Sequence, residues 1–167
     1  LKDTAISHER TYLVEVMGRN CGDLALYSAI AGGASGVMIP EIKSSIEDIA
    51  EVIKKRRSRG KLYDIIVVAE GAGNVLEIEK ELSKKVDTSI RVTILGHTQR
   101  GGSPTASDRI LATKLGIKAV ELLIEGKAGL MVGMQSGKVT THTLSYAWEN
   151  YNKTSEEDYK IANMLSL

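Results

Sequence analysis

Four charged or titratable side chains stand directly after apolar stretches of the sequence, each close to a glycine. A glycine at such a point lets the backbone approach a ligand closely. Arginine forks suit a phosphate, while a carboxylate and an imidazole suit sugar hydroxyls. The pattern therefore predicts a binding site for a small, polar, anionic ligand. The four side chains are Arg19, Glu70, His97 and Arg100.

Each residue also has an ordinary structural interpretation, which the sequence leaves open. Arg19 fits a solvated turn, Glu70 fits a cap of the following helix, and His97 fits the edge of a core. Cys21 fits a small packed residue better than a nucleophile, and the basic residues 54–61 fit a solvated helix end. The four side chains follow three separate apolar runs, each of which is expected to be a strand, and this coincidence favours the functional interpretation.

The elements that must position these side chains alternate along the chain between strands and helices. A continuous apolar run such as IIVVA is typical of a parallel strand covered on both faces. The alternation predicts an α/β fold with a mainly parallel sheet, in which ligands bind beyond the carboxyl ends of the strands. The expected strands are residues 11–17, 36–40, 63–70, 90–95 and 130–135, and the expected helices are 22–33, 44–60, 75–85, 107–126 and 155–165.

Two of the expected helices carry further signals. The helix at 44–60 begins with a capping box, formed by Ser44 with Glu47 or by Ser45 with Asp48. The longest helix is expected to turn one apolar face inward. That face comprises Leu111, Leu115, Ala119, Leu122 and Leu123. Outside the helices, the best candidate for a linker is residues 150–155.

Composition excludes several classes of protein. The 167 residues suffice for a domain with a sizeable core, and a net charge of +1 argues against nucleic-acid binding. No apolar run approaches the length of about 18 residues that a membrane span needs. The single cysteine, Cys21, excludes an internal disulfide and a cysteine-rich metal site and fits a reducing cytosol. The segment GMQSGK at 133–138 lacks the spacing of a phosphate-binding loop.

Four segments resemble the C-terminal half of the bacterial ATP-dependent 6-phosphofructokinases, a member group of the phosphofructokinase family. They are VEVMGRNCGDLAL, AIAGGASGVMIPE, VVAEGAG and ILGHTQRGGSPTASDRILATKLG. The resemblance implies a three-layer α/β/α fold with a mainly parallel sheet. It implies the glycolytic transfer of a phosphoryl group from ATP to the 1-hydroxyl of fructose 6-phosphate, giving fructose 1,6-bisphosphate.

The resemblance also implies roles for individual residues in the fructose 6-phosphate pocket. Glu70 would hydrogen-bond sugar hydroxyls, and His97 and Arg100 would hold the phosphate end of the sugar. Arg10 and Arg91 would reach across a subunit interface to the phosphate in the neighbouring site. The pocket residues supplied within one subunit would be Met17, Gly18, Arg19, Glu70, His97 and Arg100.

An effector site between subunits, for ADP and phosphoenolpyruvate, is implied by the same resemblance. Arg59, Lys61 and Tyr63 match its basic part. Lys2 stands where an arginine is usual, and Ser35 stands where an acidic residue helps to hold the effector's magnesium. These two departures weigh against activation by a nucleotide.

The resemblance finally implies a division of the chain and an incomplete active site. Residues 1–98 would form the fructose 6-phosphate and effector domain, 99–149 would pack with an ATP domain, and 150–167 would return to the first domain. The catalytic aspartate and the loops for ATP with Mg²⁺ would lie upstream of Leu1, so the chain alone is expected to bind no cofactor and to be inactive. The start at Leu1 rather than methionine indicates a fragment, a processed chain or an incomplete one.

The full-length enzyme would be a cytoplasmic homotetramer with no nucleic-acid or membrane partner. Two alternatives stay open at this point. One is a non-catalytic module that binds a sugar phosphate or an effector. The other is a pyrophosphate-dependent phosphofructokinase, which upstream residues would distinguish.

Overall fold

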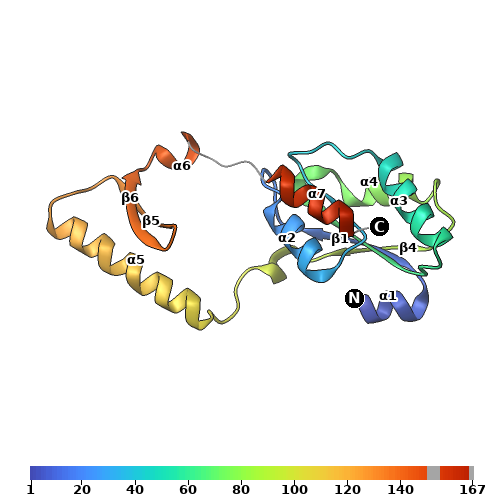
Figure 1. Ribbon diagram of the computed structural model, residues 1–167, viewed down its shortest axis with the longest axis horizontal. Helices are drawn as coiled ribbons and strands as arrows, with labels where there is room; N and C mark the ends of the chain where they lie inside the picture. Colours follow the sequence, from blue (N-terminus) through green and yellow to red (C-terminus); the bar gives the residue numbers. More distant parts are fainter. Residues whose placement is uncertain (150–154, 166–167) are drawn as a thin grey trace. The chain divides into compact units, whose positions relative to one another are not determined.

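The computed structural model describes residues 1–149 and 155–165 (Figure 1). The expected linker at 150–155 therefore lies outside the described residues, apart from Ser155, as does the beginning of the expected tail at 150–167. The elements in chain order are α1 (Lys2–His8), β1 (Thr11–Val16), α2 (Asp23–Gly32), β2 (Gly36–Met38), α3 (Ile46–Ser58), β3 (Asp64–Ala69), η1 (Glu70–Ala72), α4 (Val75–Leu82), β4 (Ile90–Ile94), η2 (Gly96–Gln99), α5 (Ala106–Ile124), β5 (Leu130–Gln135), β6 (Lys138–Thr143), α6 (Tyr146–Glu149) and α7 (Glu156–Leu165).

The chain divides into two compact units. Unit 1 comprises Leu1–Arg100 with Lys153–Leu167, and unit 2 comprises Gly101–Asn152. Among the described helices, none is long and apolar enough to cross a membrane. Unit 1 holds every candidate site residue named above, so the site can be built from this unit by itself.

Unit 1 contains a four-stranded parallel sheet in the order β2-β3-β1-β4. Strand β1 lies at its centre and pairs with β3 on one side and β4 on the other. Its burial pattern is nearly continuous, as a strand covered on both faces requires. The predicted mainly parallel sheet is therefore confirmed.

Helices cover both faces of this sheet. On one face, Ala25, Leu26 and Ala29 of α2 pack with Val14 and Val67 of the sheet. On the other face, helices α3 and α4 close a second core around the strands. Its members are Leu13, Met38, Ile49, Ala50, Ile53, Ile66, Val68, Val75, Ile78, Leu82, Val86 and Ile90. Helix α7 packs with α2 (Figure 1), and the three-layer α/β/α architecture is confirmed.

The connections explain why the helices are divided between the faces. The chain leaves β1 across β3 to reach the edge strand β2, and it leaves β3 in the opposite direction to reach β4. Because crossovers between parallel strands are right-handed, opposite directions place α2 and α4 on opposite faces. After the adjacent strands β1 and β3, the chain therefore continues in opposite directions. Their carboxyl ends form the topological switch point, where open α/β sheets bind ligands.

Helix α3 is fixed by its first turn. The Ser45 side chain accepts a hydrogen bond from the Asp48 N–H at 3.1 Å, and Asp48 Oδ2 accepts one from the Ser45 N–H at 2.9 Å. Of the two predicted capping boxes, the one formed by Ser45 and Asp48 is present. Such a cap satisfies amide groups that the helix itself leaves unpaired.

A buried ion cluster lies at the amino edge of the sheet, where β3 begins. The Asp64 side chain is 0% exposed, and its Oδ1 lies 2.7 Å from Arg56 Nε. Arg57 Nε lies 3.5 Å from Asp64 Oδ2. Burial raises the pKa of Asp64, while the two guanidiniums act in the opposite direction.

In unit 2, strand β5 pairs with β6 as an antiparallel hairpin and not as a strand of the parallel sheet. The turn contains Ser136 and Gly137, whose φ angles are 49° and 77°. Two residues with positive φ in a row favour a tight hairpin turn whose twist matches the strands. The segment GMQSGK at 133–138 is therefore part of a hairpin. Strand β6 was not predicted because its sequence, KVTTHT, has no alternating apolar pattern.

The inward face expected for α5 is present only in part. Leu122 is buried and Leu115 and Ala119 are half-buried, but Leu111 is 39% and Leu123 is 66% exposed. The helix is apolar around much of its surface, with Ile117 and Val120 also exposed. The hairpin β5–β6 is too small to cover a helix of 19 residues. A face covered along its whole length would need a further layer, which the described residues of unit 2 do not supply.

Candidate functional site

The strand register brings three loops together at the carboxyl edge of the sheet. Val16 of β1 pairs with Ala69 of β3, and Glu15 pairs with Ile94 of β4. The Leu95 N–H donates to the Glu15 carbonyl at 3.1 Å and extends this pairing by one residue. The residues that follow β1, β3 and β4 therefore start side by side.

The Arg19 loop, residues 17–22, is held at its beginning by the loop after β3. The Gly18 N–H donates to Glu70 Oε1 at 3.4 Å, and the Gly71 N–H donates to the Gly18 carbonyl at 3.1 Å. A Cβ at position 71 would lie 1.9 Å from the Arg19 carbonyl oxygen, so only glycine permits this close approach. Gly18 itself has a φ of 141°. The two glycines explain how the backbone carries Arg19 past the strand end.

Gln99 connects the same loop to the segment after β4. Its Oε1 accepts a hydrogen bond from the Met17 N–H at 3.0 Å, and its Nε2 donates to the Gly96 carbonyl at 3.1 Å. Gln99 ends η2, which also carries His97 and precedes Arg100. Sequence reasoning assigned no role to Gln99. Its one available signal was its place between His97 and Arg100.

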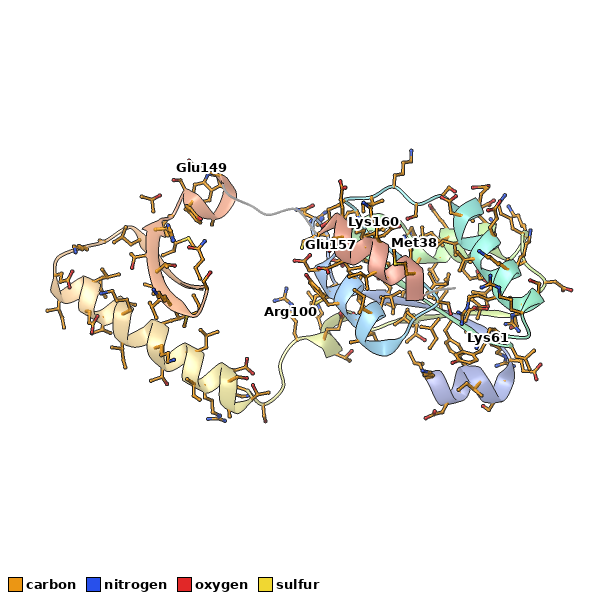
Figure 2. The ribbon with its side chains drawn as sticks, viewed as in Figure 1. Met38, Lys61, Arg100, Glu149, Glu157 and Lys160 are labelled. Carbon is orange, nitrogen blue, oxygen red and sulfur yellow. The ribbon has the colours of Figure 1, made fainter. Side chains whose placement is uncertain are left out.

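The candidate side chains themselves are exposed at this edge. Arg19, Glu70, His97 and Arg100 are all exposed, and Met17 is half-buried. Within residues 1–149 and 155–165, the Arg19 guanidinium makes no hydrogen bond or ion pair. Arg100 also extends into solvent (Figure 2). A cation left without a protein partner at a strand end is available to an anionic ligand.

Glu15 is a further carboxylate near this edge that sequence reasoning did not single out. It is half-buried on β1. Its burial raises its pKa, and the charge of Glu70 raises the pKa further, while a hydrogen bond from the Val75 N–H lowers it. The available signal was a glutamate inside the apolar run TYLVEV. Glu15 and Glu70 thus form an electrostatically coupled pair beside the switch point.

Arg10 and Arg91 lie toward the opposite edge of the sheet. Arg10 directly precedes β1, and Arg91 is the second residue of β4, where it pairs with Tyr12. The six residues of β1, at about 3.3 Å each, separate the two edges by about 20 Å. The structure therefore does not bring these two arginines to the Arg19 loop of the same chain.

The candidate effector residues also lie at the amino edge. Arg59 ends α3, and the exposed Lys61 (Figure 2) and half-buried Tyr63 lead into β3. Ser35 is 2% exposed, and its Oγ accepts a hydrogen bond from the Ile65 N–H at 3.2 Å. Ser35 is therefore used inside the fold and does not present its hydroxyl to solvent.

The described residues offer no metal site. No group of three or more His, Cys, Asp or Glu side chains in residues 1–149 and 155–165 could hold a metal ion. Glu15 and Glu70 interact as a pair and do not make a set of three metal ligands. We therefore assign no Mg²⁺ ligand to this part of the chain.

Comparison with known sequences gives a consistent set of relatives. Residues 1–123 match the family model described as "Phosphofructokinase". The ATP-dependent 6-phosphofructokinase of Fusobacterium nucleatum is 51% identical over 167 residues, which is 99% of this chain and 52% of the relative. That of Clostridioides difficile is 48% identical, over 100% of this chain and 52% of the relative. The chain thus spans about half the length of the curated relatives it matches.

Solved structures agree with the sequence relatives. The phosphofructokinase of Saccharomyces cerevisiae is similar with a TM-score of 0.78 and 34% identity, over 98% of this chain and 24% of that chain. A pyrophosphate-dependent phosphofructokinase from Marinobacter aquaeolei has a TM-score of 0.70 and 23% identity, over 86% of this chain and 43% of that chain. At that identity the second likeness concerns the fold alone.

Proposed function

The chain belongs to the phosphofructokinase family, and we propose that it carries the fructose 6-phosphate-binding half of an ATP-dependent 6-phosphofructokinase. The observation that carries the proposal is the meeting of the loops after β1, β3 and β4 at the switch point of the sheet. Those loops present the exposed side chains of Arg19, Glu70 and His97. The proposed reaction is the conversion of fructose 6-phosphate and ATP into fructose 1,6-bisphosphate and ADP.

In this proposal the residues of the carboxyl edge bind and orient the sugar phosphate. Glu70 engages the Gly18 N–H through Oε1, which leaves Oε2 to accept a hydrogen bond from a sugar hydroxyl. Arg19, His97 and Arg100 offer N–H donors to the ligand, and the arginine forks suit phosphate oxygens. Phosphoryl transfer depends chiefly on positioning and charge stabilisation. The contribution proposed for this chain is to hold the acceptor hydroxyl in place.

The proposal extends to contacts between subunits. We propose that Arg10 and Arg91 serve the site of a neighbouring copy in a homotetramer, because most of the length of β1 separates them from the Arg19 loop of their own chain. We likewise propose that Arg59, Lys61 and Tyr63 contact an effector such as ADP or phosphoenolpyruvate. The burial of Ser35 argues that this effector site lacks a magnesium ligand at that position.

The donor is proposed to be ATP, held with Mg²⁺ by residues outside this chain in a cytoplasmic enzyme. The support is the printed name of the relatives at 46–51% identity, which are ATP-dependent enzymes. The pyrophosphate-dependent structures are 21–23% identical and support the fold only.

A chimera tests the proposal directly. This chain would replace the matching half of the Fusobacterium nucleatum enzyme, and the conversion of fructose 6-phosphate would be measured with ATP and, separately, with pyrophosphate. We expect turnover with ATP and loss of turnover in the same chimera carrying Arg19→Ala. A folded chimera that converts fructose 6-phosphate with neither donor would contradict the proposed reaction.

The 167-residue chain by itself provides the second arm. Titration calorimetry should detect binding of fructose 6-phosphate but not of fructose, because the arginines require a phosphate. In a coupled assay with ATP the same chain should show no turnover, since the described residues contain neither a metal-ligand cluster nor a phosphate-binding loop.

A further inference from the structure

We propose that Glu41 is a positioning residue for the sugar-phosphate site, which holds the end of the Arg19 loop through the backbone of Gly22. The proposal rests on the proposed function of that site and names the part of the fold that sets its geometry. Glu41 itself lies after β2, on the far side of β3 from β1, and it carries none of the candidate ligand contacts described above.

The contact is made by both oxygens of one carboxylate. The Gly22 N–H lies 2.8 Å from Glu41 Oε1 and 3.1 Å from Oε2. Hydrogen bonds to an ionised acceptor are about twice as strong as those between neutral groups. Gly22 is buried, whereas Glu41 is half-buried. The amide that Glu41 accepts from would therefore be poorly hydrated without it, and an unpaired buried amide is costly.

Glu41 is held on a short, rigid turn. Ile39 and Ile42 form an isolated antiparallel bridge that closes the turn Ile39–Ile42. Pro40 stands at the second position of this turn, where its fixed φ suits the geometry. Ile39 is 2% exposed, and a Cβ on Gly22 would lie 2.4 Å from Ile39 Cβ. The turn that carries the carboxylate is therefore packed closely against Gly22.

This contact completes the anchoring of the Arg19 loop. Its beginning is fixed by Gln99, Glu70 and Gly71, as described above. Its end is fixed by Glu41 at Gly22. Between the two anchors, Arg19 and Asn20 are exposed. Because the guanidinium of Arg19 has no partner among the described residues, its position depends on the backbone that carries it.

The sign of the effect separates positioning from simple charge. A carboxylate near an anion site repels the anion, so if Glu41 acted through its charge alone, neutralising it would strengthen binding. If Glu41 acts by position, the variant that keeps its length should preserve binding even without the charge. The variant that keeps the charge but shortens the reach should weaken binding.

Three variants of the 167-residue chain test this. Glu41→Gln retains one acceptor oxygen at the original reach, Glu41→Asp retains the charge with one methylene fewer, and Glu47→Asp is the matched control. Glu47 lies on α3 and pairs with Lys85 at 2.7 Å, not with a residue of the Arg19 loop. Calorimetry would give the Kd for fructose 6-phosphate, and amide hydrogen exchange would report on Gly18 and Gly22.

We expect Glu41→Asp to raise the Kd about tenfold, the effect of losing one charge-assisted hydrogen bond, with faster exchange at Gly22. Glu41→Gln and the control should stay within about threefold of the parent chain. Equal Kd and equal exchange in Glu41→Asp would overturn the proposal, as would tighter binding in Glu41→Gln.

The two measurements, calorimetry and amide hydrogen exchange, also distinguish failure of this proposal from failure of the proposed function. If the parent chain binds no fructose 6-phosphate, the proposed function of the site fails. The exchange rates then decide the positioning role alone: unchanged exchange at Gly18 and Gly22 in Glu41→Asp refutes it, and faster exchange supports it.

Discussion

The two edges of the sheet in unit 1 use their charged residues in opposite ways. At the amino edge, Asp64 is 0% exposed and its carboxylate lies between Arg56 and Arg57. At the carboxyl edge, Arg19 and Glu70 are exposed, and the side chains of Gln99 and Glu70 accept hydrogen bonds from the backbone amides of Met17 and Gly18. Charges that stabilise a fold are paired and removed from water, whereas charges that await a ligand stay hydrated. The contrast predicts that substitutions at the two edges have different consequences.

The largest effect on stability is expected at the amino edge. Asp64→Ala removes the fully buried carboxylate that pairs with Arg56, whose side chain is 11% exposed, and so breaks this ion pair. Breaking a buried pair in this way costs about 3 kcal/mol. Urea unfolding should show this loss. As a control, Glu81→Ala breaks the exposed pair with Lys84 at 2.6 Å and should cost less than about 0.5 kcal/mol. Similar losses in both variants would remove the distinction between buried and exposed pairs.

The corresponding substitution at the carboxyl edge should affect binding and not stability. Arg19→Ala removes a guanidinium that has no partner among residues 1–149 and 155–165. We expect the Kd for fructose 6-phosphate to rise by about 10- to 100-fold, the loss of a charged hydrogen bond, with an unchanged melting temperature. Calorimetry and thermal unfolding of the same sample measure both. Lys54→Ala, at an exposed lysine of α3, is the control. A lower melting temperature with normal affinity would make Arg19 a structural residue.

A smaller effect is expected at Ser45, which tests whether every polar residue near the carboxyl edge serves the ligand. Ser45 also follows a strand at the carboxyl edge, but its side chain caps α3. Ser45→Ala should therefore cost about 1 kcal/mol of unfolding free energy and leave the affinity for fructose 6-phosphate unchanged. Ser45→Asp should restore most of the stability because aspartate also caps helices. Weaker binding of fructose 6-phosphate by Ser45→Ala would show that a residue at the carboxyl edge affects the ligand even when its side chain is used inside the fold.

The sequence predicted the features that depend on local pattern. Continuous apolar runs identified β1 and β3, and the spacing of Ser45 and Asp48 identified the start of α3. The order of strands and helices then placed Arg19 and Glu70 at the edge where they lie. These features were accessible because each is encoded within a few neighbouring residues.

Contacts between loops were not accessible in the same way. Gln99 is separated by 82 positions from the Met17 amide that it accepts from, and Glu41 by 19 positions from Gly22. Which loops meet is fixed by the register of the strands and not by the loops themselves. Helix α1 was missed for another reason. It has seven residues and no side-chain hydrogen bond at its N-cap, Leu1, so the sequence carries no start signal.

The smallest expected effect concerns Glu15. Its burial is intermediate between that of the buried Asp64 and that of the exposed Glu70. Burial and the charge of Glu70 raise its pKa in the folded chain above the ordinary value of 4.5. A carboxyl group with a raised folded pKa favours folding fully below its unfolded pKa, and that contribution is lost as the pH rises through the folded pKa. Glu15→Gln should therefore gain stability relative to the parent chain between pH 4.5 and neutrality, and no relative change should occur at lower pH.

A second substitution divides the two causes of this shift. Glu70→Gln removes the neighbouring charge but leaves Glu15 buried, so the pKa of Glu15 should fall toward its ordinary value without reaching it. Titration of the Glu15 carboxyl resonance by NMR measures this, and fructose 6-phosphate provides a further comparison. A bound anion adds negative charge near the pair and should raise the pKa of Glu15, provided that it binds at the carboxyl edge. If fructose 6-phosphate binds but leaves that resonance unchanged, the anion lies elsewhere. The carboxyl edge would then not be the ligand-binding edge of the sheet.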